Sequence, residues 1–296
     1  MKKSNGYGEA VYHCYAKVNL ILKVAGRRPD GYHDIDSLLQ TIDLADTVRL
    51  GWGGSDLSVS CSDPSLDGEA NLVWKAAKLF FKAVGVRAGV RISIDKRIPM
   101  AAGLGGGSTD AACVLNALAA RFGVPPGSDR MKQLALETGS DVPYLLAGGL
   151  ARVRGRGEIV EPLAGLEGLD LVAATPQAEV RSSWAYGRLR MELTESGKSY
   201  SILSLDSALA DISSLAGALQ NDLEEAVIDG FPVVGLLKER MIELGALGAV
   251  MSGSGPTVLA VVEGRAQAKQ MAEHLAADGH RAFALRTTDS AHLVCN

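Results

Sequence analysis

The first regular pattern in the chain is an alternation of apolar and polar positions. Apolar residues occupy every even position from 18 to 24. A period of two predicts a β-strand, and it places Lys17 and Asn19 together on one face. The sequence RRPDG at residues 27–31 predicts the end of this strand, because Asp-Gly readily adopts the positive φ angles of tight turns.

The same two periodicities predict the other elements. Strands are expected at residues 47–50, 56–61, 90–98, 169–174 and 281–285, with a strand pair around the SGSGP turn at 252–256. Helices are expected at residues 71–84, 112–122, 129–138, 206–228 with an interruption, 233–244 and 266–277. Ser140 or Asp141 is expected to cap a short helix that ends at 148–149. Strands and helices without strict alternation predict an α+β protein with two layers in each half. Glycine and proline breaks at 152–162 predict a crossing between domains.

A glycine-rich loop, PMAAGLGGGSTDAA at residues 99–112, joins a predicted strand to a predicted helix. Glycines let backbone amides approach an anion closely, and the positive end of a helix favours phosphate. Ser108 is expected to be the N-cap, and the hydroxyls of Ser108 and Thr109 can reach a phosphate or Mg²⁺. The loop lacks the lysine of a GxxxxGK[ST] P-loop, so its positive charge must come from elsewhere.

Two other interpretations of this loop remain. A tight strand-to-helix connection with no ligand is one of them. The other is a dinucleotide site, although GxGxxG fits residues 103–108 only without its last glycine, and the chain has no early βαβ unit.

Composition narrows the class of protein. Of the 296 residues, 47% are hydrophobic and 22% are charged, as in ordinary soluble domains. The net charge of −4 argues against a general nucleic-acid or acidic-membrane surface. The four cysteines show no CxxC pair or metal-ligand spacing, which favours free thiols in a reduced cytoplasm over disulfides. We expect neither a signal peptide nor a membrane span, since the uncharged stretch 244–262 is broken by its central SGSGP turn.

The motif PxxxGLGxxS[ST]xAA resembles the signature of the GHMP kinases, a family of small-molecule kinases. A lysine on an N-terminal strand and a late glycine turn, MSGSGP at 251–256, are similar to two further motifs of that family. AKVNLILKVAGRRPDGYHDIDSLLQ (16–40) and SDVPYLLAGGLARVRGRGE (140–158) resemble one branch of it. That branch phosphorylates a cytidyl-diphosphate sugar alcohol in the non-mevalonate route to isoprenoid precursors, and PDGYH is the most specific part of the match.

The resemblance implies a two-domain α+β fold. It implies an N-terminal ATP-binding domain at 1–161, like domain 2 of ribosomal protein S5, and a ferredoxin-like C-terminal domain at 162–296. ATP and Mg²⁺ are the implied cofactors, with no dedicated metal ligand in the protein. A cytoplasmic monomer or homodimer is expected.

Two residues carry the implied chemistry. Asp141 aligns with the family's catalytic aspartate, which orients the attacking hydroxyl and accepts its proton. Lys17 resembles the lysine beside it, which keeps the carboxylate ionised and supplies the charge that the glycine loop lacks. The simpler alternatives are an N-cap for Asp141 and a solvated surface lysine for Lys17.

The remaining site residues are also implied by the resemblance. Those expected at the nucleotide are Asn71, Lys96, Pro99, Gly103, Leu104, Gly105, Gly106, Gly107, Ser108 and Thr109. Those expected at the substrate are Asn19, Tyr32, His33, Tyr186, Gly253, Ser254 and Gly255. Tyr32 and Tyr186 are expected on opposite faces of the cytosine. The alternative for each tyrosine is partial burial in the core. Lys96 is expected to extend its charge out of a buried strand face, and Asp110 to face outward.

Two other functions remain open at this point. One is a kinase of the same family that acts on mevalonate, homoserine or isopentenyl phosphate. DGYH argues against it, because those substrates have no base to hold. The other is a nucleotide sensor without catalysis, against which the joint presence of Lys17, Asp141 and the glycine loop argues.

Overall fold

The computed structural model describes residues 9–166, 168–189 and 205–295. Up to Pro162 its elements are β1 Glu9–Arg27, β2 His33–Trp52, β3 Leu57–Cys61, two short 3₁₀ turns, α1 Leu72–Val84, β4 Val90–Asp95, α2 Gly106–Phe122, α3 Asp129–Thr138, α4 Val142–Leu145, β5 Leu150–Gly155 and β6 Ile159–Pro162. After that they are β7 Asp170–Thr175, α5 Ser182–Gly187, α6 Leu205–Ala208, α7 Ile212–Ala218, β8 Gln220–Asn221, α8 Glu224–Gly230, α9 Pro232–Glu243, β9 Gly248–Met251, β10 Val258–Val261, α10 Arg265–Ala277, β11 Arg281–Thr288 and β12 His292–Cys295. The predicted α+β class is confirmed.

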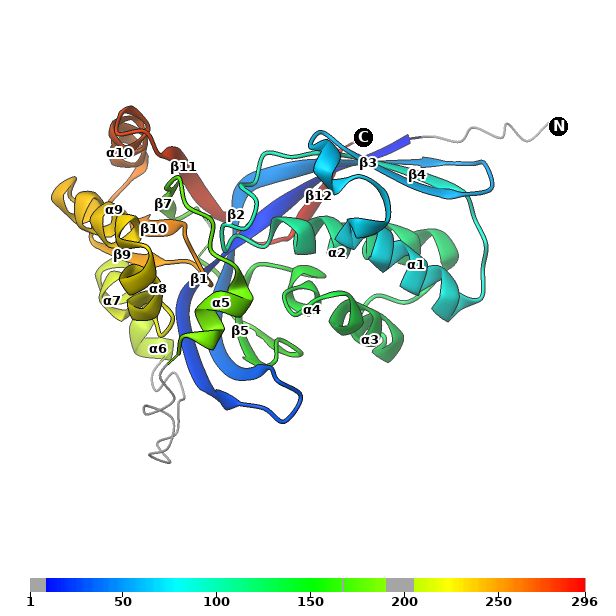
Figure 1. Cartoon of the computed structure of the whole chain (residues 1–296), viewed down its shortest axis with the longest axis horizontal. Helices are drawn as coiled ribbons and strands as arrows, with labels where there is room; N and C mark the ends of the chain where they lie inside the picture. The colour runs from blue at the N-terminus through cyan, green and yellow to red at the C-terminus, as the bar shows by residue number, and fades with distance from the viewer. Residues whose placement is uncertain (1–8, 167, 190–204, 296) are drawn as a thin grey trace.

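Two long strands form the spine of the molecule. β1 and β2 pair antiparallel over almost their whole lengths and run between two groups of helices (Figure 1). The strand order through them is β12-β1-β2-β11-β7-β10-β9, with β3, β4, β5, β6 and β8 attached beside this path. Strands from both halves of the chain therefore belong to one hydrogen-bonded system.

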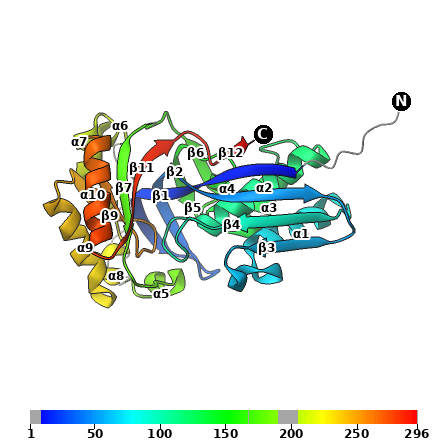
Figure 2. The same cartoon turned by 90° about the horizontal axis from the view of Figure 1, so that it is seen from above.

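The first group of helices covers the sheet formed by β1 to β4, which lie side by side in Figure 2. The helix α1 presents Val73, Ala76 and Phe80 to this core, and α2 lies against both α1 and β1. These apolar residues recur every three or four positions, so one helix face is buried. The result is one helical layer on one sheet layer.

The second group, α8 to α10, covers the antiparallel sheet of β7, β9, β10 and β11 (Figures 1 and 2). Each group of helices forms one lobe of the molecule together with the sheet that it covers. A further apolar cluster joins these two lobes, and it includes Leu20 of β1, Leu104 of the glycine loop and Val250 of β9. The lobes are consequently packed together at the place where the glycine loop lies. The domain boundary at residues 161 and 162 stays a prediction.

Most of the predicted strands and helices agree with the structure, but the crossing expected at residues 152–162 does not. Residues 152–162 were expected to cross between domains, but they form the end of β5 and all of β6, a hairpin paired with β2. Ala151 and Val153 point inward in alternation and bury this hairpin on the sheet. The strand β12, which pairs with β1 at the opposite end of the chain, was not predicted.

Helix length bears on the expected absence of a membrane span. The longest helix in the described part of the chain is α2, with 17 residues. A transmembrane helix needs about 20 predominantly apolar residues. Within the ranges that the structure describes, no helix is both long and apolar enough to cross a bilayer.

Candidate active site

One cavity of about 910 Å³ opens between the two lobes. Its walls come from β1, the β1–β2 turn, the glycine loop, the α3–α4 loop, α5 and the β9–β10 turn. The predicted site residues that line it are Lys17, Asn19, Tyr32, His33, Lys96, Pro99, Gly103, Leu104, Gly105, Gly106, Gly107, Ser108, Asp141, Tyr186, Gly253 and Ser254. Residues from distant parts of the chain therefore meet around one space.

Lys17 and Asp141 face each other in this cavity. The Lys17 ammonium lies 3.5 Å from Asp141 Oδ2 and donates a hydrogen bond of 2.7 Å to Asn19 Oδ1. The lysine side chain is only 5% exposed, so it is not a solvated surface charge. Asp141 occupies the N-cap position of α4 but makes no side-chain cap bond, and 38% of its side chain is exposed. The carboxylate is thus free of the capping role and available to a ligand.

Two segments that are distant in sequence hold this lysine strand in place. The Lys17 amide donates to the carbonyl of Leu104 in the glycine loop, and the Asn19 amide donates to Ser252 Oγ. The Ser252 hydroxyl in turn donates to the carbonyl of Gly103. The strand, the glycine loop and the late glycine turn are therefore joined by hydrogen bonds directly behind the Lys17 ammonium.

The glycine loop ends differently from the prediction. The N-cap of α2 is Gly105, at φ 70°, and the helix begins at Gly106, so Ser108 lies in the first turn and is not the cap. A side chain at Gly105 would be strained at this φ, and its Cβ would lie 2.9 Å from Lys17 Cγ. Because Gly105 has no side chain to bond the first amides of α2, those amides remain available at the cavity wall for an anion.

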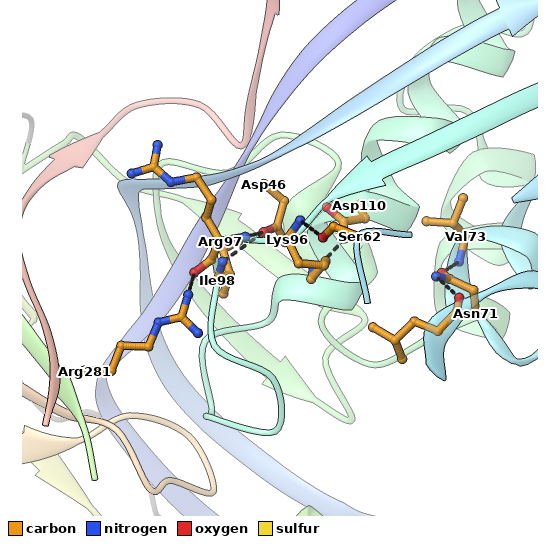
Figure 3. A network of polar contacts seen from close by, with 10 residues as sticks. Asp46, Ser62, Asn71, Val73, Lys96, Arg97, Ile98, Asp110 and Arg281 are labelled. Atoms are coloured by element: carbon orange, nitrogen blue, oxygen red, sulfur yellow. Dashed lines mark hydrogen bonds and ion pairs between the residues drawn. The ribbon is translucent and has the colours of Figure 1, made fainter. Parts of the chain in front are cut away.

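Lys96 and Asp110 also differ from the prediction. Lys96 does not extend a free charge, and Asp110 does not face outward: the Lys96 ammonium is ion-paired with both Asp46 and Asp110 (Figure 3). Asp46 Oδ1 also accepts from the amides of Arg97 and Ile98. Sequence reasoning missed Asp46, since the pairing register of β2 and β4 brings it beside Lys96 and no local pattern indicates this.

This group holds two carboxylates and one ammonium away from water. Asp46 and Asp110 are buried, and Asp110 Oδ1 has no hydrogen-bond partner in the described structure. Burial raises the pKa of Asp110 to about 7, with Asp46 adding to the rise and Lys96 opposing it. Burial also depresses the pKa of Lys96, but the two carboxylates outweigh that effect and hold it above its ordinary value. The lysine stays charged and serves its protein partners.

The aromatic residues lie at the other end of the cavity. The rings of His33 and Tyr186 are stacked, with centroids 5.1 Å apart and planes at 29°. The Tyr32 ring is stacked against the guanidinium of Arg156, which lies 4.1 Å from the ring centroid. Burial, followed by the charge of Arg27, lowers the pKa of His33 below its ordinary value. The structure therefore gives each tyrosine a stacking partner of its own, which the sequence did not predict.

Arg156 and Ser182 also line the cavity and were missed by sequence reasoning. The Ser182 hydroxyl lies 2.8 Å from Ser254 Oγ in the late glycine turn. Neither residue has a periodicity or spacing that distinguishes it. A basic residue inside the matched segment GRGE is the one signal that could have indicated Arg156.

Three predicted residues do not line the cavity: Asn71, Thr109 and Gly255. Asn71 caps α1, with its Oδ1 accepting from the Val73 amide and its Nδ2 donating to the Leu66 carbonyl. Figure 3 shows its side chain directed to Val73 and separate from Lys96. Thr109 is buried within α2. Leu66 and Leu72, which lie on either side of Asn71 in this region, do line the cavity.

A divalent cation would find few protein ligands here. No group of three or more His, Cys, Asp and Glu side chains forms a metal cluster in the described ranges. The Ser108 hydroxyl and the Asp141 carboxylate are oxygen donors on the cavity wall, and oxygen is what Mg²⁺ prefers. The residues present therefore fit a Mg²⁺ ion held mainly by phosphate and water.

Family models match both halves of the chain. The GHMP kinases N terminal domain matches residues 71–149, and the GHMP kinases C terminal model matches 204–281. A crystal structure of homoserine kinase from Cytophaga hutchinsonii has the same fold, with 19% identity, full coverage of both chains and a TM-score of 0.74. The fold and the site together define a small-molecule kinase of the GHMP class.

Relatives with higher sequence identity show which family of GHMP kinases the chain belongs to. The 4-diphosphocytidyl-2-C-methyl-D-erythritol kinase of Gloeobacter violaceus is 39% identical over 286 residues, covering 94% of each chain. Its counterpart in Geobacter metallireducens is 37% identical and covers 88% of this chain and 92% of that one. A crystal structure of 4-(cytidine 5'-diphospho)-2C-methyl-D-erythritol kinase is 38% identical, with a TM-score of 0.80 and coverage of 94% and 98%. The chain belongs to the 4-diphosphocytidyl-2-C-methyl-D-erythritol kinase family.

Proposed function

We propose that this protein transfers the γ-phosphoryl group of ATP to the 2-hydroxyl of 4-diphosphocytidyl-2-C-methyl-D-erythritol. One observation carries this proposal: the Lys17–Asp141 pair lies in the same cavity as the glycine loop and the aromatic residues. A kinase for this substrate needs these three parts within reach of one another. The family to which the chain belongs has the same activity in its named members.

Asp141 acts on the attacking hydroxyl. Its carboxylate is open to the cavity and lies 3.5 Å from the Lys17 ammonium. The substrate oxygen attacks the γ-phosphorus, the bond from that phosphorus to the β–γ bridging oxygen breaks, and ADP leaves. The hydroxyl proton passes to Asp141, while Lys17 polarises the same hydroxyl. This reaction balances with no further reactant.

The glycine loop binds the phosphates of ATP. The first-turn amides of α2 and the positive end of its dipole face the cavity without competition from a capping side chain. Mg²⁺ would neutralise charge on the phosphates, with the Ser108 hydroxyl as the nearest protein donor in the loop. Lys96, directly after β4, contributes by joining β2 and α2 through its ion pairs with Asp46 and Asp110.

The aromatic end of the cavity binds the cytosine. Tyr32, His33 and Tyr186 offer ring faces and polar edges, which suit a base and have no counterpart in a simple alcohol substrate. The diphosphate then lies between the base and the Lys17–Asp141 pair, beside Gly253 and Ser254.

A coupled ADP-release assay with Mg-ATP tests the proposal. Turnover is expected with the cytidyl-diphosphate substrate and not with mevalonate or homoserine. Turnover with one of those alcohols instead would keep the kinase and overturn the substrate. ATP binding without turnover of any of them would contradict catalysis altogether and favour a nucleotide sensor.

A further inference from the structure

The turn between β5 and β6 contacts both the aromatic end of the cavity and the segment that carries Asp141. Arg156 in this turn lies over Tyr32, and its Nη2 donates to the carbonyl of Leu136 in α3 at 3.2 Å. Gly157 packs against Ser140 so closely that a Cβ at this position would overlap the Ser140 carbonyl oxygen. One turn therefore connects the predicted base-binding tyrosine to the residue preceding Asp141.

Tyr32 itself has little else to hold its ring. It lies at the tip of the β1–β2 turn, is 47% exposed, and its backbone amide donates to Asp30 Oδ1. The guanidinium carbon of Arg156 lies 4.1 Å from the Tyr32 ring centroid, well inside the range of a cation–π contact. Arg156 therefore fixes the plane of Tyr32 and leaves its other face for a ligand.

The His33–Tyr186 pair leaves no gap for a base between its two rings. The centroids of His33 and Tyr186 are 5.1 Å apart, whereas a base inserted between two rings needs about 7 Å, twice a van der Waals contact of about 3.5 Å. In this arrangement the free face of Tyr32 is a place where a base can stack without separating a pair of rings.

We propose that Arg156 is a specificity-determining residue: by stacking on Tyr32 it presents the opposite face of that ring to the cytosine of the substrate. This inference rests on the proposed function. Arg156 acts through Tyr32, so its planar shape matters as well as its charge. A lysine at the same position keeps the charge but loses the plane.

Steady-state kinetics of R156K and R156A test this role. Both substitutions are expected to raise KM for the cytidyl-diphosphate substrate by about two- to fivefold, which corresponds to about 0.5–1 kcal/mol, the range of cation–π contacts at exposed sites, because Tyr32 is 47% exposed. KM for ATP and the melting temperature should stay near the wild-type values. The double variant R156A/Y32L should be no worse than Y32L, since the arginine acts through that ring.

A matched control is R121K. Arg121 lies 5.7 Å from the ring centroid of Trp52, outside the cavity, and this substitution should leave both KM values unchanged. A wild-type KM for the cytidyl substrate in R156A would overturn the inference. An equal rise in KM for the cytidyl substrate and for ATP, together with a lower melting temperature, would also overturn it. In both cases turnover by the wild-type enzyme would still support the proposed kinase activity. Absence of wild-type turnover with the cytidyl substrate would instead overturn the proposed function, and the inference with it.

Discussion

The two ends of the cavity are built in opposite ways. At the glycine loop the charged groups are buried and bonded to the protein, as Lys96 is by Asp46 and Asp110. At the aromatic end the groups are more exposed and held by stacking, as Tyr32 is by Arg156 and His33 by Tyr186. The glycine-loop end is therefore fixed by buried ion pairs, whereas the aromatic end is held by ring contacts and leaves Tyr32 47% exposed.

This difference fits what each end has to recognise. Phosphates need fixed backbone amides, and such amides stabilise transferred charge best when they do not have to reorganise. A flat base gains affinity from ring faces, which tolerate small changes in orientation. Lys17 and Asp141 lie where the two ends meet, so substitutions at this pair and at either end should have effects of different kinds.

The largest effect is expected at the meeting point. D141N removes the proton acceptor but keeps the size of the side chain, and kcat should fall by about 10²–10⁴-fold. ATP binding, measured by titration calorimetry, should stay close to wild type because the glycine loop is unchanged. Retention of wild-type kcat would remove Asp141 from the acceptor role.

At the nucleotide end, K96M should reduce folding stability. It leaves the buried carboxylates of Asp46 and Asp110 without their ammonium, and breaking a buried ion pair costs about 3–5 kcal/mol. Urea denaturation would measure this loss. The control is K132M. Lys132 is 68% exposed, and an exposed ion pair such as the one with Asp129 contributes less than about 1 kcal/mol to folding stability. Equal stability of the two variants would contradict a nucleotide end that is fixed by buried ion pairs.

The sequence predicted the parts of this site that depend on local pattern. The period of two placed Lys17 and Asn19 on one face, and their side chains are hydrogen-bonded. The start of α2 was wrong because Gly105 takes a left-handed conformation and begins the helix at two glycines, which have low helix propensity. Helix propensity alone would not place a helix start there.

The contacts that were missed are all between distant segments. Asp46 meets Lys96 through the register of β2 and β4, and Arg156 meets Tyr32 across 124 positions of sequence. Charge and aromatic character are visible in a sequence, but strand register is set by the packing of whole sheets. Asp110 was placed outside, whereas the structure pairs it with Lys96 in the interior.

The charged group at the nucleotide end should also make stability depend on pH. The pKa of Asp110 is about 7 in the folded protein against an ordinary value of 3.8, so between these values the folded state binds more protons than the unfolded state. Stability should therefore fall as pH rises from about 4 to 7, by at most about 1.4 kcal/mol per pH unit from this group. D110N should remove that contribution.

The measurement is the free energy of unfolding in urea at pH 5 and pH 7.5 for wild type and D110N. The difference between the two proteins isolates this carboxylate from other titrating groups. D129N is the control, since Asp129 is a fully exposed carboxylate. A pH dependence in D110N identical to that of wild type would show that Asp110 is not the buried group that titrates.

At the aromatic end the expected effect is smaller and falls on substrate binding. Y186L removes a ring that is stacked on His33 and lines the cavity, and stacking of a base on an aromatic side chain contributes about 1–3 kcal/mol. Because His33 already covers one face of the Tyr186 ring, a base can gain contact only with the other face. KM for the cytidyl substrate should therefore rise by only about tenfold, with KM for ATP unchanged. Y186F keeps the ring and should stay within about twofold of wild type. If KM for the cytidyl substrate rose as much in Y186F as in Y186L, the hydroxyl and not the ring face would contribute to binding. The two ends of the cavity would then differ less than their geometry indicates.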